Sequence, residues 1–191
     1  MAAMKEVFGE IRTQILILGT LVGLMWGLEI LDTFVFRNGL DTFGILTRNP
    51  IGLRGILFAP FLHGGFGHLS ANTVPFVVLG WLIMAQGISD FVVVSAICMV
   101  VGGLGTWLFG ARGLHIGASG VIFGYVGFLL ARYYFDRRLS SGIIALVVGC
   151  SYGSILWGIL PSTPGISWEG HLFGFLGGVV AARLIKPAVR I

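Results

Sequence analysis

Residues 117–130 read GASGVIFGYVGFLL, a stretch without a charged side chain in which one serine, Ser119, lies between Ala118 and Gly120. The flanking sequence is equally apolar, because 56% of the 191 residues are hydrophobic and only 10% are charged. An average soluble domain carries about 25% charged residues, and disordered chains are less apolar still. The composition therefore excludes both classes and predicts an integral membrane protein that is surrounded by lipid.

The apolar runs divide into six segments, each close to the roughly 20 helical residues that cross the hydrocarbon core. Polar or helix-breaking residues separate them, for example Asn49 and Pro50 after the first run and Asp136, Arg137 and Arg138 after the fourth. The sequence predicts an all-α membrane protein, a single six-transmembrane-helix bundle over residues 1–191. Residues 110–120, between the third and fourth runs, are glycine-rich and only weakly polar. A re-entrant stretch is therefore an alternative to a simple connection there. Helices are expected at residues 14–34, 68–86, 90–110, 118–135, 142–160 and 167–186.

The distribution of Lys and Arg predicts the orientation of these spans. Six spans place both termini on one side, and eight of the twelve basic residues fall on that side. By the positive-inside rule, both termini are cytoplasmic and the protein is a multi-pass protein of the plasma (inner) membrane. The first run lacks a cleavage pattern and is expected to be a retained span. The eight are Lys5, Arg12, Arg132, Arg137, Arg138, Arg183, Lys186 and Arg190, and the other four are Arg37, Arg48, Arg54 and Arg112.

Composition also limits the partners. The basic residues are scattered between apolar runs instead of forming one basic face, which argues against a nucleic-acid partner and leaves the lipid bilayer as the expected surroundings. The two cysteines, Cys98 and Cys150, lie inside apolar runs and are predicted to be core residues without a disulfide or a metal. No cofactor is expected, and the oligomeric state has no signal in the sequence. The long first loop, residues 35–67, is half apolar and is expected to lie partly in the membrane interface.

Small residues recur at helical spacing in the fourth and sixth runs. Gly120 and Gly124 are separated by three residues, as are Gly170, Gly174 and Gly178. In lipid, where no hydrophobic force drives helices together, small residues at this spacing let two helix backbones approach closely. This pattern predicts close helix packing, either within the bundle or in a dimer.

Four polar residues lie at predicted membrane depths where a polar side chain costs free energy. His68 and Asn72, Ser119, and His171 all fall within the first few residues of the second, fourth and sixth predicted helices. If both termini are cytoplasmic, these three helices begin at the outer face. At 1.5 Å rise per residue, the four side chains then share one layer within about 10 Å of the outer surface. His63 and His115 are the other histidines near this level.

These residues are the parts of an acyl-transfer site. Ser119 lies at the start of its predicted helix, in the glycine-rich stretch 117–120. This position leaves its hydroxyl uncrowded and backbone N–H groups free at the helix start. An imidazole can take the serine proton, and His171 is the proposed base. His68 and Asn72 are four residues apart, so they project from one helix face and can donate to a developing oxyanion.

At these residues the chain resembles the rhomboid intramembrane serine proteases. The matching segments are His63-Gly-Gly-Phe-Gly-His68-Leu-Ser-Ala-Asn72, Gly117-Ala-Ser119-Gly120 and Gly170-His171-Leu-Phe-Gly174-Phe-Leu-Gly-Gly178. They occur in the family's order, on its second, fourth and sixth helices. The resemblance covers almost the whole chain and implies the family's minimal six-helix core.

The resemblance also implies a role for each matching residue. Ser119 and His171 would form a catalytic dyad without a carboxylate, and His68, Asn72 and the Ser119 backbone N–H would form the oxyanion hole. The substrate would be a single-pass membrane protein whose transmembrane segment unwinds and is cut near its outer end at a small residue. Supporting roles fall to Gly117 and Gly120 of the serine motif, to Phe123 as the aromatic against the imidazole, to His63 as a brace of the first loop, and to Arg54, which follows Leu53 where the family commonly has tryptophan.

The same residues also bear on other possible functions. Neither a zinc HExxH motif nor a pair of intramembrane aspartates is present, and Lys5 and Lys186 lie at the termini, so metallo-, aspartyl and Ser–Lys intramembrane proteases are set aside. Glu169, two residues from His171, is predicted to be a solvated interfacial charge. Two alternatives stay open. One is a non-catalytic rhomboid-like binder of transmembrane helices. The other is a metal- or haem-binding bundle that uses His63, His68, His115 and His171.

Overall fold

A computed structural model describes residues 2–161 and 165–185 of the chain. Within these residues, six long helices follow one another, and a single helical turn, α2 (Gly55–Phe58), lies in the first loop. Two helices continue in other helical forms: α1 into the π-helical η1 (Asp32–Phe36) and α6 into the 3-10 helix η5 (Gly153–Ile159). The six are α1 (Ala2–Leu31), α3 (Phe66–Met84), α4 (Ile88–Phe109), α5 (Ser119–Asp136), α6 (Leu139–Tyr152) and α7 (Trp168–Leu184).

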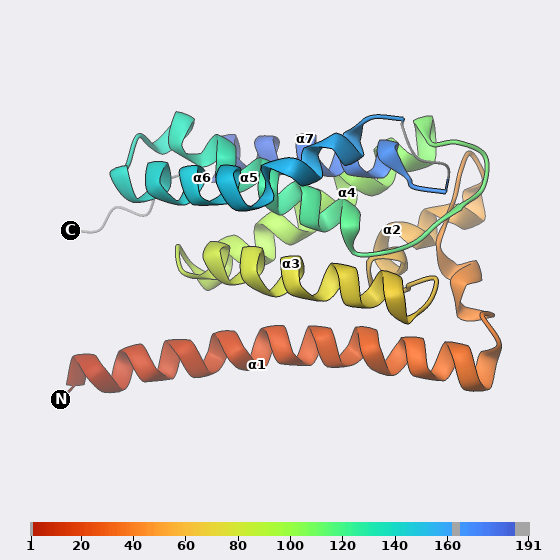
Figure 1. The fold of residues 1–191 in the computed structure, drawn as a ribbon, viewed down its shortest axis with the longest axis horizontal. Coiled ribbons are helices and arrows are strands. Elements are labelled where there is room, and N and C mark those ends of the chain that lie inside the picture. The colour runs from red at the N-terminus through yellow and green to blue at the C-terminus, as the bar shows by residue number, and fades with distance from the viewer. Residues whose placement is uncertain (1, 162–164, 186–191) are drawn as a thin grey trace.

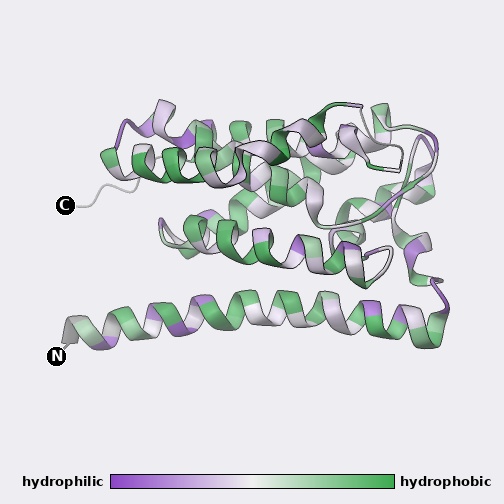
Figure 2. Ribbon diagram, viewed as in Figure 1, coloured by the Kyte–Doolittle hydropathy of each residue, from purple (hydrophilic) through white to green (hydrophobic). Residues whose placement is uncertain are grey.

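Each of the six predicted spans is helical, and the predicted six-helix membrane bundle is confirmed. Among the described residues, four helical segments are long and apolar enough to cross a bilayer by themselves: Val7–Phe36, Phe66–Met84, Ile88–Phe109 and Leu139–Ile159. Figure 2 shows these helices as largely hydrophobic, with hydrophilic residues gathered toward helix ends and connections. The first helix begins at Ala2, well before the predicted residue 14. Lys186 and Arg190, which were counted in predicting the orientation, lie outside the described residues.

The other two spans, α5 and α7, lie in the middle of the bundle. Their most extensive contacts are with each other, and α7 also packs along α4. Glycines make this approach possible: a methyl group at Gly174 would overlap the carbonyl oxygen of Gly120, and one at Gly178 would overlap that of Gly124. The close packing predicted from the glycine spacing is therefore confirmed, and it occurs between α5 and α7.

The helices are arranged so that α3, α5 and α7 begin at the same end of the bundle, at the right of Figure 1. Helix α1 lies at one edge, beside α3 (Figure 1). The indole Nε1 of Trp81 donates to Gln14 Oε1 at 2.7 Å, which fixes α1 against the far end of α3. Cys98 is buried as predicted, whereas Cys150 is exposed on α6, so its predicted core position is wrong. Helix α6 presents that side outward because little of it is covered by other helices.

The first loop is ordered and holds one small sheet. Strand β1 (Ile45–Leu46) pairs antiparallel with β2 (Leu114–His115), with Ile45 opposite His115. The glycine-rich segment between α4 and α5 therefore forms a strand and a loop. Arg54 donates to the carbonyl of Thr42 and lies 4.3 Å above the Phe43 ring, so it braces the loop from within. The rest of the loop is formed by η2 (Leu40–Phe43), η3 (Pro50–Arg54), α2 and η4 (Ala59–Phe61).

His63 joins this loop to the start of α5. It stands in the connection between η4 and α3 and is only 2% exposed. Its Nε2 accepts a hydrogen bond from the backbone N–H of Ala118 at 3.4 Å, one residue before α5. Burial, and to a smaller extent the neighbouring His68, lower the pKa of His63 to about 4. The side chain is therefore a neutral structural contact between the first loop and α5.

Substitution at the closest helix contact should destabilise the fold. In Gly178→Ala, the added methyl group overlaps the Gly124 carbonyl, which forces α5 and α7 apart and costs about 1–3 kcal/mol or more. Gly27→Ala on α1 is the matched control, because nothing lies within 4 Å of a methyl group there. Thermal unfolding in detergent micelles should show a lower Tm for Gly178→Ala alone. An equal Tm for both variants and the wild type would contradict this account of the packing.

The contribution of His63 to the free energy of unfolding should fall as the pH is lowered from 6.5 to 4. In this range the unfolded chain binds a proton at His63, while the folded chain, in which the pKa of His63 is about 4, does not. This contribution then decreases by up to about 3 kcal/mol. Asp41 acts in the opposite direction, because burial raises the pKa of its carboxyl to about 6.

The variant His63→Gln isolates this contribution, since it removes the titrating ring and leaves Asp41 in place. Thermal unfolding at pH 7 and pH 4.5 should show a smaller loss of stability for His63→Gln than for the wild type. The same loss in both proteins would mean that His63 is not the group that takes up the proton.

Candidate active site

Ser119 is the first residue of α5, and the chain reaches it through a sharp turn. Gly117 has φ +114°, a conformation that L side chains rarely adopt, and a methyl group there would lie 2.6 Å from Cε1 of His68. The first hydrogen bond within the helix runs from the N–H of Ile122 to the carbonyl of Ala118. The N–H of Ser119 thus precedes the hydrogen-bonded part of the helix, as the motif predicted.

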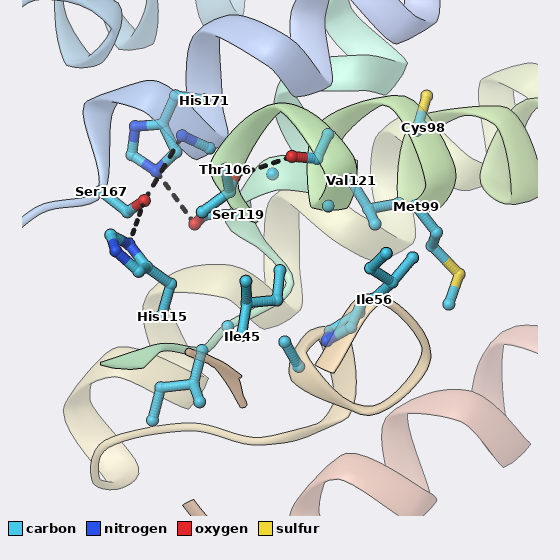
Figure 3. Close-up of a pocket in the computed structure, with 18 residues that line it drawn as sticks. Ile45, Ile56, Cys98, Met99, Thr106, His115, Ser119, Val121, Ser167 and His171 are labelled. Carbon is cyan, nitrogen blue, oxygen red and sulfur yellow. Dashed lines mark hydrogen bonds between the residues drawn. The ribbon is translucent and has the colours of Figure 1, made fainter. Parts of the chain in front are cut away.

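His171 lies in the first turn of α7, directly opposite Ser119. Ser167 caps this helix, since its hydroxyl accepts from the N–H of Gly170 at 3.3 Å. The Nε2 atom of His171 is 2.9 Å from Oγ of Ser119, a hydrogen bond that links two helices across 52 residues of sequence (Figure 3). The structure therefore brings the predicted nucleophile and the predicted base into contact.

The other ring nitrogen of His171 determines which way this hydrogen bond runs. Nδ1 is 2.9 Å from the carbonyl oxygen of Gly158 in η5. A carbonyl only accepts, so Nδ1 carries the proton and Nε2 of the neutral ring accepts from the Ser119 hydroxyl. Phe123 lies flat against the ring, with centroids 4.0 Å apart and planes inclined by 5°. The imidazole is held in one tautomer and one plane without a carboxylate.

His68 and Asn72 lie in the first two turns of α3, on the side of that helix that faces the site. The N–H of Gly64 donates to Nδ1 of His68 at 3.5 Å, so the neutral ring carries its proton on Nε2, the atom that lies against Gly117. One N–H of Asn72 donates to the carbonyl of His68 at 3.1 Å. Both side chains line the same groove as Ser119 and His171.

Two hollows meet at this pair. A wide groove of about 960 Å³ passes over Ser119 and is lined by His68 and Asn72 on one side and by residues 165–169 on the other. A small cavity of about 50 Å³ adjoins Ser119, among largely apolar side chains. Figure 3 shows the cavity's walls from α4, α5 and the first loop. Those residues include Ile45, Ile56, Cys98, Met99, Thr106 and Val121.

The remaining predicted residues occupy supporting positions. Gly120 lies where α5 passes α7, and a methyl group there would be 3.3 Å from the carbonyl oxygen of Gly170. His63 contacts the backbone of Ala118 behind the nucleophile. In the part of the chain that the structure describes, no three His, Cys, Asp or Glu side chains gather closely enough to hold a metal ion. The four histidines thus do not form the metal site of the alternative hypothesis.

The prediction that Glu169 is a solvated charge is wrong. Its side chain is only 5% exposed, and Oε1 accepts from the backbone N–H of Ala111 at 2.8 Å. The sequence argument considered only the face of α7 that carries His171, and it missed the loop before α5 that covers Glu169. The carboxylate accepts from the second residue past the end of α4, a partner that only tertiary folding supplies.

Sequence reasoning also missed Gly158, Ser167 and the contact of His115. Gly158 acts through its carbonyl, which gives no signal in the sequence. Serine is preferred at the position just before a helix, so this preference was the signal that would have identified Ser167 as a cap. His115 Nδ1 lies 2.7 Å from Ser167 Oγ, so His115 is tied into the site and is not a free interfacial residue.

Comparison with known proteins identifies the family of this chain. The Rhomboid domain matches residues 52–188, a range that includes every predicted site residue from His63 to His171. An uncharacterized protein of Mycobacterium tuberculosis is 44% identical over 180 residues, which cover 90% of this chain and 75% of that protein. A corresponding protein of Mycobacterium leprae is 42% identical over 180 residues, covering 90% of this chain and 71% of its own.

A further relative has a name that states an activity. The Bacillus subtilis protein YdcA, named provisionally as a rhomboid protease, is 29% identical over 180 residues, which cover 90% of this chain and 86% of YdcA. The domain match, the long apolar helices and these relatives agree with one another. The chain is an integral membrane protein and belongs to the rhomboid family.

Proposed function

We propose that this protein is an intramembrane serine endopeptidase that cuts transmembrane segments of single-pass membrane proteins near the outer face. The observation that carries the proposal is the 2.9 Å hydrogen bond from Ser119 Oγ to His171 Nε2, in a groove wide enough for a peptide. Family membership supports the same reaction class. A protein that only bound transmembrane helices would have no use for a serine aligned with a base.

Ser119 and His171 together supply both proton transfers of peptide hydrolysis. As Oγ bonds to the scissile carbonyl carbon, the hydroxyl proton moves to Nε2 of His171. When the C–N bond breaks, the imidazolium returns that proton to the leaving amine, and an acyl-enzyme remains on Ser119. Water then attacks the ester by the same route and releases Ser119. The Gly158 carbonyl, bonded to Nδ1–H, favours the imidazolium that forms in between.

Three donors surround the position where the oxyanion develops. The Ser119 N–H precedes the hydrogen-bonded part of α5, His68 carries its proton on Nε2, and the amide of Asn72 has a second N–H beyond the one bonded to the His68 carbonyl. Donors that are already in place strengthen as charge grows in the transition state and cost no reorganisation. We assign the oxyanion hole to these groups.

The two hollows suggest how a substrate is held. A helical peptide bond is shielded by its own hydrogen bonds, so the segment must unwind before its carbonyl reaches Ser119. The groove of about 960 Å³ accommodates an unwound strand, and the cavity of about 50 Å³ accommodates only a small side chain next to the cut bond. With both termini cytoplasmic, as the basic residues predict, the groove opens toward the outer face of the membrane.

Helix α6 with η5 is proposed to admit the substrate. Only 6% of the most apolar window of Leu139–Ile159 is buried, against 39% for Ile88–Phe109 of α4. Segments with few buried contacts open at the lowest cost. A disulfide that ties η5 to α7, against which it packs, should therefore block cleavage of a transmembrane substrate, and unchanged cleavage would contradict this route.

Substitution of either member of the pair should abolish cleavage. Purified protein in detergent is incubated with a model single-pass substrate, and Ser119→Ala and His171→Ala are each expected to give no product, because the two groups act as one unit. Asn72→Ala should slow the reaction by about 10²-fold if its amide donates to the oxyanion. Wild-type rates in Ser119→Ala or His171→Ala at unchanged folding would overturn the proposed function.

The contact of Gly158 with the base should also be measurable. In Gly158→Ala the added methyl group lies 2.9 Å from Cζ of Phe123 and 3.2 Å from Nδ1 of His171, so it displaces the ring from Ser119. Gly153→Ala in the same 3-10 helix is the matched control, since nothing lies within 4 Å of its methyl group. The kcat of Gly158→Ala should fall about tenfold or more, while Gly153→Ala keeps the wild-type value. Equal kcat values would show that η5 does not orient the base.

A further inference from the structure

A second serine–histidine contact lies beside the proposed catalytic pair. His115, in β2, has Nδ1 2.7 Å from Oγ of Ser167 and Nε2 3.0 Å from the carbonyl oxygen of Ala111. Figure 3 shows Ser167 between His115 and His171, at the start of α7. We call the hydrogen bond between His115 and Ser167 the 115–167 bridge.

The proton positions of this bridge follow from its partners. The Ala111 carbonyl only accepts, so Nε2 of the neutral His115 ring carries the proton and Nδ1 accepts from the Ser167 hydroxyl. The same Ser167 oxygen accepts from the N–H of Gly170 as the cap of α7. Ser167 is therefore engaged both as donor and as acceptor, which suits a structural link better than a nucleophile.

The bridge connects the two segments that deliver the reacting groups. His115 precedes Ser119 by four residues, and Ser167 precedes His171 by four residues. A second hydrogen bond, from the Ala111 N–H to Glu169 Oε1 at 2.8 Å, joins the same two segments. Since the chain between His115 and Ser119 and the chain between Ser167 and His171 are both short, a shift at the bridge changes the distance between nucleophile and base.

We propose that His115 is a positioning residue: through the 115–167 bridge it holds the start of α7 against the loop before α5, and so sets the alignment of His171 with Ser119. This inference rests on the proposed peptidase function. His115 does not touch the reacting atoms, but its ring lines both the groove and the small cavity. A substitution that keeps a ring of similar size should therefore lower kcat and leave substrate binding nearly unchanged.

The test compares kcat and KM for cleavage of a model transmembrane substrate by folded, purified variants. His115→Phe keeps a ring of similar size and removes both nitrogens; its kcat should fall about tenfold or more, with KM within about twofold of the wild type. His115→Asn keeps an acceptor at the position of Nδ1, and its kcat should recover to within about threefold of the wild type.

Ser95→Ala is the matched control. It removes a hydrogen bond of the same 2.7 Å length, between Ser95 and Tyr125, in the bundle away from the site. This variant should lose thermal stability while its kcat stays at the wild-type value. If His115→Phe does not fold, Ser167→Ala is measured in its place, and the same fall in kcat is expected.

Two results would overturn the inference while the proposed function stands. One is a wild-type kcat in His115→Phe or its replacement, in an assay where the wild type cleaves and Ser119→Ala does not. The other is an equal loss in His115→Asn and His115→Phe, which would show that the bond to Ser167 is not what matters. A wild-type protein that cleaves no transmembrane substrate would instead refute the proposed function, and this inference with it.

Discussion

The close approach of α5 and α7 is the constraint on which the rest of the structure depends. Glycines on both helices let the backbones touch, with Gly174 and Gly178 against the carbonyls of Gly120 and Gly124. Ser119 begins one of these helices and His171 lies in the first turn of the other, so the same contact that packs the bundle sets their 2.9 Å separation. Packing and the proposed chemistry are therefore consequences of one interface between two short, central helices.

The second requirement is that the imidazole keeps one tautomer without a carboxylate. A backbone carbonyl at Gly158 and the flat face of Phe123 meet that requirement at little electrostatic cost, because neither places a buried charge in the bundle. The carbonyl belongs to η5, the continuation of the least buried span. In the proposed function, the segment that admits the substrate is thus also the one that orients the base.

Much of this architecture is readable from the sequence, for identifiable reasons. Lipid imposes long apolar runs, and the glycine spacing marks the helices that touch, so the six spans and the α5–α7 contact were predictable. The layer of His68, Asn72, Ser119 and His171 followed from helix starts alone. Gly158 acts through its backbone, and Glu169 and His115 depend on a loop folded over α7, so their contacts have no periodic signal. The exposed Cys150 was missed because an apolar run does not reveal which side faces lipid.

The most direct test of the account is an experimental structure of the protein after reaction with a peptidyl fluorophosphonate, a reagent that bonds covalently to an activated serine. The account requires phosphorus bonded to Oγ of Ser119, and a phosphoryl oxygen within hydrogen-bond distance of the Ser119 N–H and of the side chains of His68 and Asn72. An adduct on another residue, or an unmodified Ser119 that still bonds His171 after prolonged exposure, would contradict it.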